Sequence, residues 1–162
     1  MELKSKILKL IESNSKITNS ELAAMLDLDT NEVSKLIAEM EADKVICGYA
    51  TLIDWDKTDN QNVSAMIELK ITLQKGTGFD KIAEKVYSFP EVEAVYLMSG
   101  AYDLLVQIKH APMKDIANFV SGSLSVIDEV QSTATHIILK KYKDYGIVFN
   151  KSETDKRQMV TP

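Results

Sequence analysis

The 162-residue chain has little of the chemistry on which many enzymes and metal sites are built. It contains a single cysteine, Cys47, which therefore has no partner for an internal disulfide or a paired-thiolate metal site. The only two histidines, His110 and His136, do not have the spacing of a zinc site. Because a nucleophile–base pair and a phosphate-binding loop are also missing, we expect no metal, no cofactor and no catalytic residue.

Long apolar runs are missing as well. No stretch approaches the roughly 20 apolar residues that a membrane-spanning helix needs. The first residues, Met1 to Lys4, lack the charged-then-apolar order of a secretory signal. We therefore expect no membrane partner and a cytoplasmic location, in which a lone cysteine stays reduced.

Arginine is almost absent, and the chain is acidic. Of 19 basic residues only Arg157 is an arginine, and 24 carboxylates bring the net charge to −5. Residues 1–57 hold 7 lysines and 11 carboxylates, a net charge of −4, so most of the acidity lies in this segment. Because phosphate neutralisation supplies most non-specific DNA affinity, this balance disfavours a general polyanion binder without excluding a local basic surface.

The N-terminal segment has the pattern of a small helical domain. Apolar residues at helical spacing predict three short helices, the second capped near Thr18 and the third by Thr30. Residues 45–53 are rich in β-branched and aromatic side chains and predict a short hairpin or wing. The pattern indicates a winged helix-turn-helix domain over residues 1–53.

Two polar segments are expected to lie outside the folded domains. Residues 54–61 are turn-prone, and we interpret them as a linker in which Trp55 is a packing anchor. The other is residues 150–162, which we expect to be a polar, mobile tail; it follows a candidate edge strand at 145–149, which belongs to the second domain.

The second domain, residues 62–149, alternates strand and helix patterns. Helices are predicted to begin at Phe79 and Met113, and their apolar residues repeat with the same spacing. Strands are predicted at 63–73, 92–97, 102–108 and 133–139. The order βαββαβ predicts an α+β fold, a ferredoxin-like sandwich. Its helices would cover one face of the sheet, so we expect the other face to pack against a second copy in a homodimer.

Four short motifs in register resemble those of a known family. The clearest is Ser99-Gly100-Ala101-Tyr102-Asp103, which is similar to a Thr/Ser-Gly-x-Tyr/Phe-Asp signature between the second and third strands. The other three are Val45 to Tyr49, Phe89 to Val92, and Val130 to Thr135. Over about residues 3–149, a winged helix-turn-helix ahead of a ferredoxin-like domain resembles the Lrp/AsnC family of transcriptional regulators.

The resemblance implies a repressor or activator that binds double-stranded DNA as a dimer, or as a tetramer or octamer built from dimers. It also implies a small effector, commonly an amino acid, held between dimers. Gly100 would allow the backbone to approach that ligand, and Asp103 would receive an α-ammonium group. The effector-binding residues expected are Ser99, Gly100, Tyr102, Asp103, Thr133 and Thr135. The alternative is that Gly100 only turns a hairpin, Asp103 caps it, and Tyr102 is a core or interface aromatic.

The expected recognition helix departs from the family in its charge. From Asp29 to Lys44 the chain has two lysines and five carboxylates, and no arginine is present for bidentate reading of guanine. Asn31 can still read adenine, and hydroxyl and lysine groups can bind phosphate or bases. The DNA-binding residues expected are Thr30, Asn31, Ser34 and Lys35, with Lys4, Lys6 and Lys16 adding backbone contacts. We expect weak or AT-leaning recognition that depends on avidity.

Two other functional classes remain open. One is an effector-responsive assembly protein in which DNA binding has degenerated, as the acid-rich third helix would allow. The other is an enzyme, because siroheme decarboxylases share this two-domain architecture. That function would require His110 or His136 in a porphyrin-sized pocket, whereas lone histidines are usually structural or surface groups. We therefore expect a regulator and not an enzyme.

Overall fold

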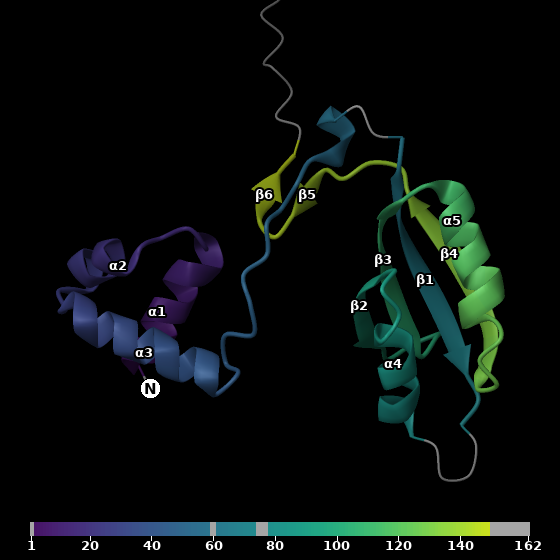
Figure 1. Cartoon of the computed structure of the whole chain (residues 1–162), viewed down its shortest axis with the longest axis horizontal. Helices are drawn as coiled ribbons and strands as arrows, with labels where there is room; N and C mark the ends of the chain where they lie inside the picture. The colour runs from purple at the N-terminus through teal and green to yellow at the C-terminus, as the bar shows by residue number, and fades with distance from the viewer. Residues whose placement is uncertain (1, 59–60, 74–77, 150–162) are drawn as a thin grey trace, which may run out of the picture. The chain divides into compact units, whose positions relative to one another are not determined.

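A computed structural model of the chain describes residues 2–58, 61–73 and 78–149. The chain divides into two compact units, with the division between Ile53 and Asp54 (Figure 1). No helix in the described residues is both long enough and apolar enough to span a bilayer.

The described part of the first unit folds as three helices: α1 (Glu2–Ser13), α2 (Asn19–Leu26) and α3 (Thr30–Ala42). Each helix buries one apolar stripe, as the spacing predicted, and the stripes meet in a common core. The most buried of these side chains are Ile7, Leu22, Val33 and Met40. A short turn joins α2 to α3, with Asp27 in a left-handed conformation at φ 55°. This is the helix-turn-helix expected from the sequence.

Local capping decides where α2 and α3 begin. Thr18 caps α2 through a capping box, in which its Oγ1 accepts from the Glu21 N–H and Glu21 Oε2 accepts from the Thr18 N–H at 2.7 Å. The prediction that Thr30 caps α3 was wrong. Asp29 has the extended backbone of an N-cap and its Oδ1 accepts from the Asn31 N–H at 2.8 Å, so Thr30 is already the first helical residue.

The predicted β hairpin at 45–53 does not form in this structure. Ile46 is buried against the helices of the first unit, and residues 47–54 have no regular secondary structure. Val45 and Tyr49 are exposed. A strand is stabilised by pairing with another strand, and within the described residues no strand pairs with this segment.

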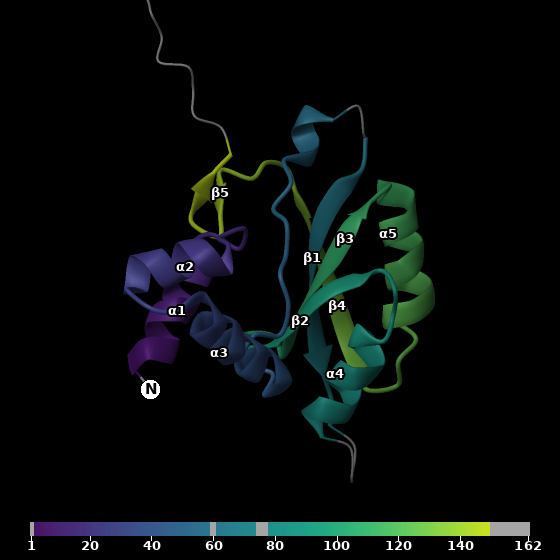
Figure 2. The same ribbon diagram turned by 60° about the vertical axis from the view of Figure 1, so that its left-hand side comes forward.

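The second unit has the predicted βαββαβ order. Its elements are β1 (Val63–Ile71), α4 (Phe79–Tyr87), β2 (Val92–Leu97), β3 (Leu104–Ala111), α5 (Met113–Phe119) and β4 (Val130–Ile138). A π-helical turn, η2 (Val120–Leu124), continues α5. Within the described residues the four strands form an antiparallel sheet in the order β2-β3-β1-β4. Both α4 and α5 lie on the same face of that sheet (Figures 1 and 2).

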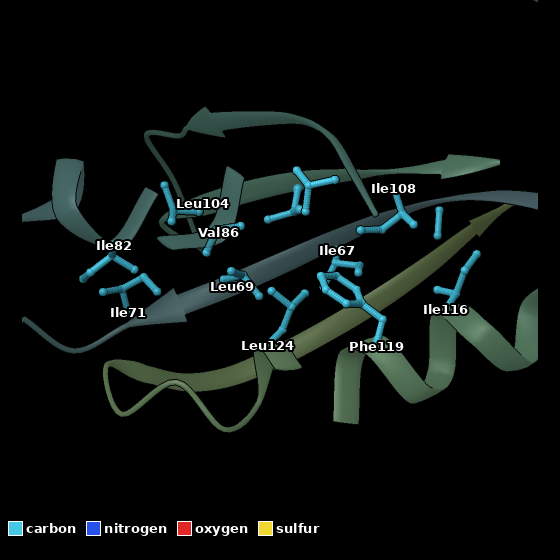
Figure 3. Close-up of a cluster of buried hydrophobic side chains, with 13 residues drawn as sticks. Ile67, Leu69, Ile71, Ile82, Val86, Leu104, Ile108, Ile116, Phe119 and Leu124 are labelled. Carbon is cyan, nitrogen blue, oxygen red and sulfur yellow. The ribbon is translucent and has the colours of Figure 1, made fainter. Parts of the chain in front are cut away.

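The sheet register explains the core of the second unit. Residues 65, 67, 69 and 71 of β1 are buried and face the helices, as their alternation predicted. Ile67 is paired with Val106 on one side and Thr135 on the other, so β1 is central. Figure 3 shows the resulting cluster, in which side chains from β1 and β3 meet those from α4, α5 and η2.

Two segments differ from their expected roles. The short helix η1 (Trp55–Lys57) lies inside the predicted linker, yet Trp55 stacks on His110 of β3 with ring centroids 5.2 Å apart. The packing role predicted for Trp55 is therefore confirmed. Of the predicted edge strand at 145–149, only Ile147–Val148 is a strand, β6, and it pairs with β5 (Lys143–Asp144) in a separate two-stranded hairpin. Positive φ at Tyr145 and Gly146 makes this tight turn. The predicted tail, 150–162, lies outside the described residues.

Candidate DNA-binding and effector sites

The N-terminal half of α3 is the exposed surface of the first unit that most resembles a DNA-reading element. Thr30, Asn31 and Lys35 are all exposed there, and Lys35 makes no ion pair with any described residue. Ser34 has a different environment. Its Oγ donates to the Thr30 carbonyl and accepts from Asn19 Nδ2, both at 2.9 Å, so its hydroxyl holds α2 against α3.

Several carboxylates of α3 have neighbouring donors. Glu39 Oε2 lies 3.0 Å from Lys4 Nζ of α1, and Glu41 Oε1 accepts from the Tyr49 hydroxyl at 2.9 Å. Partial desolvation of the Tyr49 hydroxyl, and then its hydrogen bond to Glu41, raise the pKa of Tyr49 although its ring is half exposed. Part of the negative charge of α3 is thus neutralised within the first unit. The cation that does so is Lys4, one of the lysines expected from the sequence to contact DNA. Exposed ion pairs of this kind contribute little to stability.

The loop between β2 and β3 carries the family signature and is held firmly at both ends. The Met98 N–H donates to the Asp103 carbonyl at 2.8 Å, and the Asp103 N–H donates to the Leu69 carbonyl at 2.9 Å. Between these anchors Ser99 and Gly100 are exposed, and Gly100 has a φ of 152°, which residues with side chains rarely adopt. The loop thus presents its backbone to solvent.

The Asp103 carboxylate is tied to the end of β1. Its Oδ2 accepts from the Ile71 N–H at 2.7 Å and lies 3.3 Å from Lys70 Nζ. The backbone donor at Ile71 lowers the pKa of Asp103 most, and Lys70 adds to the effect. Asp103 therefore fixes the loop on the sheet. Lys70 Nζ also donates to Oδ1, at 3.4 Å, so a ligand ammonium group would have to compete with Lys70 for that oxygen.

One chain does not gather the six predicted effector residues into one pocket. Thr133 and Thr135 lie on edge strand β4, opposite the buried Leu69 and Ile67, and so face the helix side. The signature loop leads into β3, on the other side of β1. Two strand spacings separate β3 from β4, or roughly 10 Å. Tyr102 is half-buried beside the loop.

The sequence did not reveal the partners that hold this end of the sheet. Lys70 beside Asp103 was missed, and so was Glu129, which is buried and lies 3.3 Å from Lys85 of α4. The Glu129 carbonyl also accepts from the Thr72 N–H at 2.8 Å. The alternation of apolar and polar residues predicted that Lys70 lies on a strand. Its pairing with Asp103 depends on the register between β1 and β3, and the sequence contains no local pattern that predicts this register.

The two histidines are not brought together. His110 of β3 stacks on Trp55, whereas His136 Nε2 of β4 lies 3.2 Å from Glu68 Oε1 of β1. Strand β1 lies between β3 and β4, so each histidine has its own environment.

Comparison with known families agrees with this geometry. A family model described as the Lrp/AsnC ligand binding domain matches residues 64–148, and a winged helix-turn-helix DNA-binding model matches residues 2–46. The chain belongs to the Lrp/AsnC family. This Lrp/AsnC protein is accordingly a transcriptional regulator with a DNA-binding helix-turn-helix and a ligand-binding domain.

Relatives of this Lrp/AsnC regulator match it over nearly their whole length. An uncharacterized HTH-type transcriptional regulator, YugG of Bacillus subtilis, is 48% identical over 162 residues, covering 99% of this chain and 98% of that one. The crystal structure of an AsnC family regulator from Agrobacterium tumefaciens is 25% identical with a TM-score of 0.69, over 89% of this chain and 93% of that one. A Neisseria meningitidis regulator crystallised as an L-Met complex has the same fold, with 23% identity and a TM-score of 0.69 over 89% and 92% of the two chains.

The lowered pKa of Asp103 predicts a specific pH dependence of stability. The ionised carboxylate stabilises the fold fully above its unfolded-state pKa, near 3.8, and that contribution is lost as the pH falls through the lower folded-state pKa. Asp103→Asn keeps an oxygen for the Ile71 N–H but removes the charge. Urea unfolding across a pH series should therefore show a stability difference between wild type and Asp103→Asn that is constant near neutral pH and shrinks below about pH 4.

The matched control is Asp128→Asn, which removes an exposed carboxylate in the turn before β4. The difference in unfolding free energy between Asp128→Asn and wild type should not show the pH dependence expected for Asp103→Asn. A difference for Asp103→Asn that persists unchanged into strong acid would contradict a stabilising role for the ionised carboxylate.

Proposed function

We propose that this regulator binds double-stranded DNA as a homodimer and that a small effector, such as an amino acid, binds its second unit and changes the assembly or the DNA affinity. The surface of α3 carries the DNA part of the proposal. There Thr30, Asn31 and Lys35 are exposed on the N-terminal half of the helix, while Lys4 counters the charge of Glu39.

In the proposed complex the first half of α3 enters the major groove. Asn31 hydrogen-bonds adenine, Lys35 contacts a phosphate or a guanine, and Thr30 positions the helix on the backbone. Ser34 supports this surface indirectly, by holding α2 against α3 through Asn19. The helix has no arginine and the first unit carries a net negative charge, so one copy binds its DNA half-site weakly. Two copies joined in a dimer are therefore needed for useful affinity.

Lys35→Ala tests the DNA contact. We expect weaker binding to the DNA upstream of the protein's own coding sequence, and a slope of log affinity against log salt that is shallower by about 0.9 for each phosphate that is no longer neutralised. Fluorescence anisotropy at a series of salt concentrations measures both quantities. Lys81→Ala, on α4 of the second unit, is the control and should leave the slope unchanged. Failure of the wild type to bind any DNA at low salt would refute the proposal and favour the assembly protein with degenerate DNA binding.

The sheet face opposite the helices supports the homodimer. Met66 and Leu105 lie near the middle of this uncovered face, and Glu68 and His136 pair beside them. Tyr96 adds an exposed aromatic ring. The remaining members are Ser64, Lys70, Ala94, Gln107, Ala134 and Ile138. We propose that this face packs on the same face of a second copy, because a two-fold interface covers both apolar centres at once.

Leu105→Lys tests the dimer. A lysine at the centre of the uncovered face places like charges opposite each other across the two-fold axis, so we expect the variant to sediment as an 18.1 kDa monomer at micromolar concentration. The wild type should sediment at twice that mass or more. Val126→Lys, at an exposed apolar side chain in the turn between η2 and β4, is the control and should not change the assembly. A monomeric wild type would refute the proposed interface.

The division of the effector residues supports a site completed by another dimer. The signature loop offers exposed backbone groups, and Thr133 and Thr135 offer hydroxyls, but they lie on opposite sides of β1. A ligand bridging two dimers can contact the loop of one and the threonines of the other. The Neisseria regulator crystallised with L-Met supports an amino acid as the ligand class.

Calorimetry with each of the twenty amino acids tests the effector. We expect at least one to release or absorb heat, and Thr133→Val to weaken its binding about tenfold, because a hydroxyl bonded to a charged group is removed without a change of shape. Ser132→Ala removes a hydroxyl from the opposite face of β4 and should have little effect. No heat from any amino acid would refute the effector proposal and leave the DNA and dimer proposals standing.

We infer that the protein is not an enzyme. Its relatives are named as transcriptional regulators. The two histidines that a siroheme-decarboxylase-like site would use already have separate partners, Trp55 and Glu68.

A further inference from the structure

The β5–β6 hairpin carries apolar side chains that are left largely uncovered among the described residues. Leu139, which lies just before the hairpin, is 91% exposed, and Tyr142 and Ile147 are 72% and 57% exposed. An isolated two-stranded hairpin is only marginally stable in water, and a cluster of exposed apolar side chains marks a contact surface. These side chains therefore indicate that the hairpin has a packing partner.

The strand register gives the hairpin two different faces. Asp144 pairs with Ile147, and one step outward the Phe149 N–H donates to the Tyr142 carbonyl at 3.0 Å. Residues directly opposite each other project to the same face, and successive residues along a strand alternate between faces. Tyr142, Ile147 and Phe149 therefore share one face, and we call these three side chains the apolar face of the hairpin.

The charged groups of the hairpin do not compete with this face for a partner. Lys143 pairs with Val148 on the opposite face. The Asp144 carboxylate, which shares the apolar face, already has Lys141 Nζ at 3.6 Å from its Oδ2. Lysine side chains keep their charged ends in water. The hairpin thus has one side suited to solvent and one side suited to burial.

The hairpin stands beside the uncovered sheet face. It follows closely on β4, whose last residue, Ile138, belongs to that face. Figure 2 shows β5 and α5 on opposite sides of the sheet, and Figure 1 agrees. A second copy packed on the uncovered face would therefore meet the hairpin.

The uncovered face alone is small for a stable dimer. Its four strands are six to nine residues long. At about 4.8 Å between strands and about 3.3 Å per residue, they give a flat area of roughly 500 Å² per copy, or about 1,000 Å² for two copies. Stable interfaces bury roughly 1,200–2,000 Å² in total. The dimer therefore needs further contact area, and the apolar face of the hairpin offers it.

We propose that the β5–β6 hairpin is a dimerisation arm, whose apolar face packs against a second copy of this chain at the margin of the uncovered sheet face. The proposal rests on the proposed homodimer and adds to it a surface that the sheet does not contain. By two-fold symmetry each dimer has two such contacts, one from each copy. Apolar side chains fit a protein surface and not DNA, whose phosphates would select the lysine side of the hairpin.

Ile147→Thr in the full chain tests the arm. Threonine retains a preference for strands, so the hairpin is kept while an apolar contact is lost twice in each dimer. Sedimentation equilibrium in a fixed urea concentration, chosen so that micromolar wild type is half dissociated, keeps a tight dimer measurable. We expect the dissociation constant to rise about tenfold or more. Val148→Thr, on the opposite face of the same strand, is the matched control and should change it by less than about twofold.

The outcomes separate the arm from the dimer itself. A wild type that is monomeric without urea would refute the homodimer and the arm together. A dimeric wild type with an unchanged dissociation constant in folded Ile147→Thr would refute the arm alone, and Tyr142→Thr serves the same purpose where Ile147→Thr disrupts the hairpin. Equal weakening by Ile147→Thr and Val148→Thr would contradict the assignment to one face. A changed salt slope of DNA binding with unchanged assembly would place DNA on the hairpin and overturn the proposal.

Discussion

Hydrogen bonding of β1 on both of its edges is the constraint on which the second unit depends. Because β3 and β4 flank it, alternate residues of β1 are committed to opposite faces, one buried under the helices and one uncovered. The end of the same strand receives the Asp103 carboxylate at the Ile71 N–H, and the next N–H, that of Thr72, donates to Glu129. The core, the uncovered face and the position of the signature loop thus follow from one strand.

In the first unit, the placement of charge matters more than its sum. A net of −4 over residues 1–57 disfavours DNA binding when it is treated as an average. The structure distributes that charge unevenly, since Asp29 is the N-cap of α3 and Glu39 pairs with Lys4. Lys35 stays on the exposed side of the helix without an ion pair among the described residues. A modest DNA affinity of the first unit in each copy is then compatible with a useful DNA affinity of the proposed dimer.

A single chain leaves several surfaces incomplete. The uncovered sheet face has Leu105 near its centre, and the predicted effector residues are divided between the loop at Gly100 and the threonines of β4. Assembly would complete both features, and it is the simplest physical reason for a regulator to couple a ligand to DNA affinity.

Local pattern in the sequence determined the helices, most of the strands, their βαββαβ order, the Thr18 cap and the family signature that contains Asp103. These features depend on which residues share a face or follow each other in a turn, and that information lies within a few positions of the chain. Only the tertiary structure decided that Asp29 and not Thr30 caps α3, that residues 45–53 form no hairpin, and that Asp103 binds the Ile71 N–H. The cap depends on which of two neighbouring capping residues takes the extended N-cap backbone. The other two outcomes depend on strand pairing and register set by distant residues, because a strand or a carboxylate takes its partner from whatever the fold brings beside it.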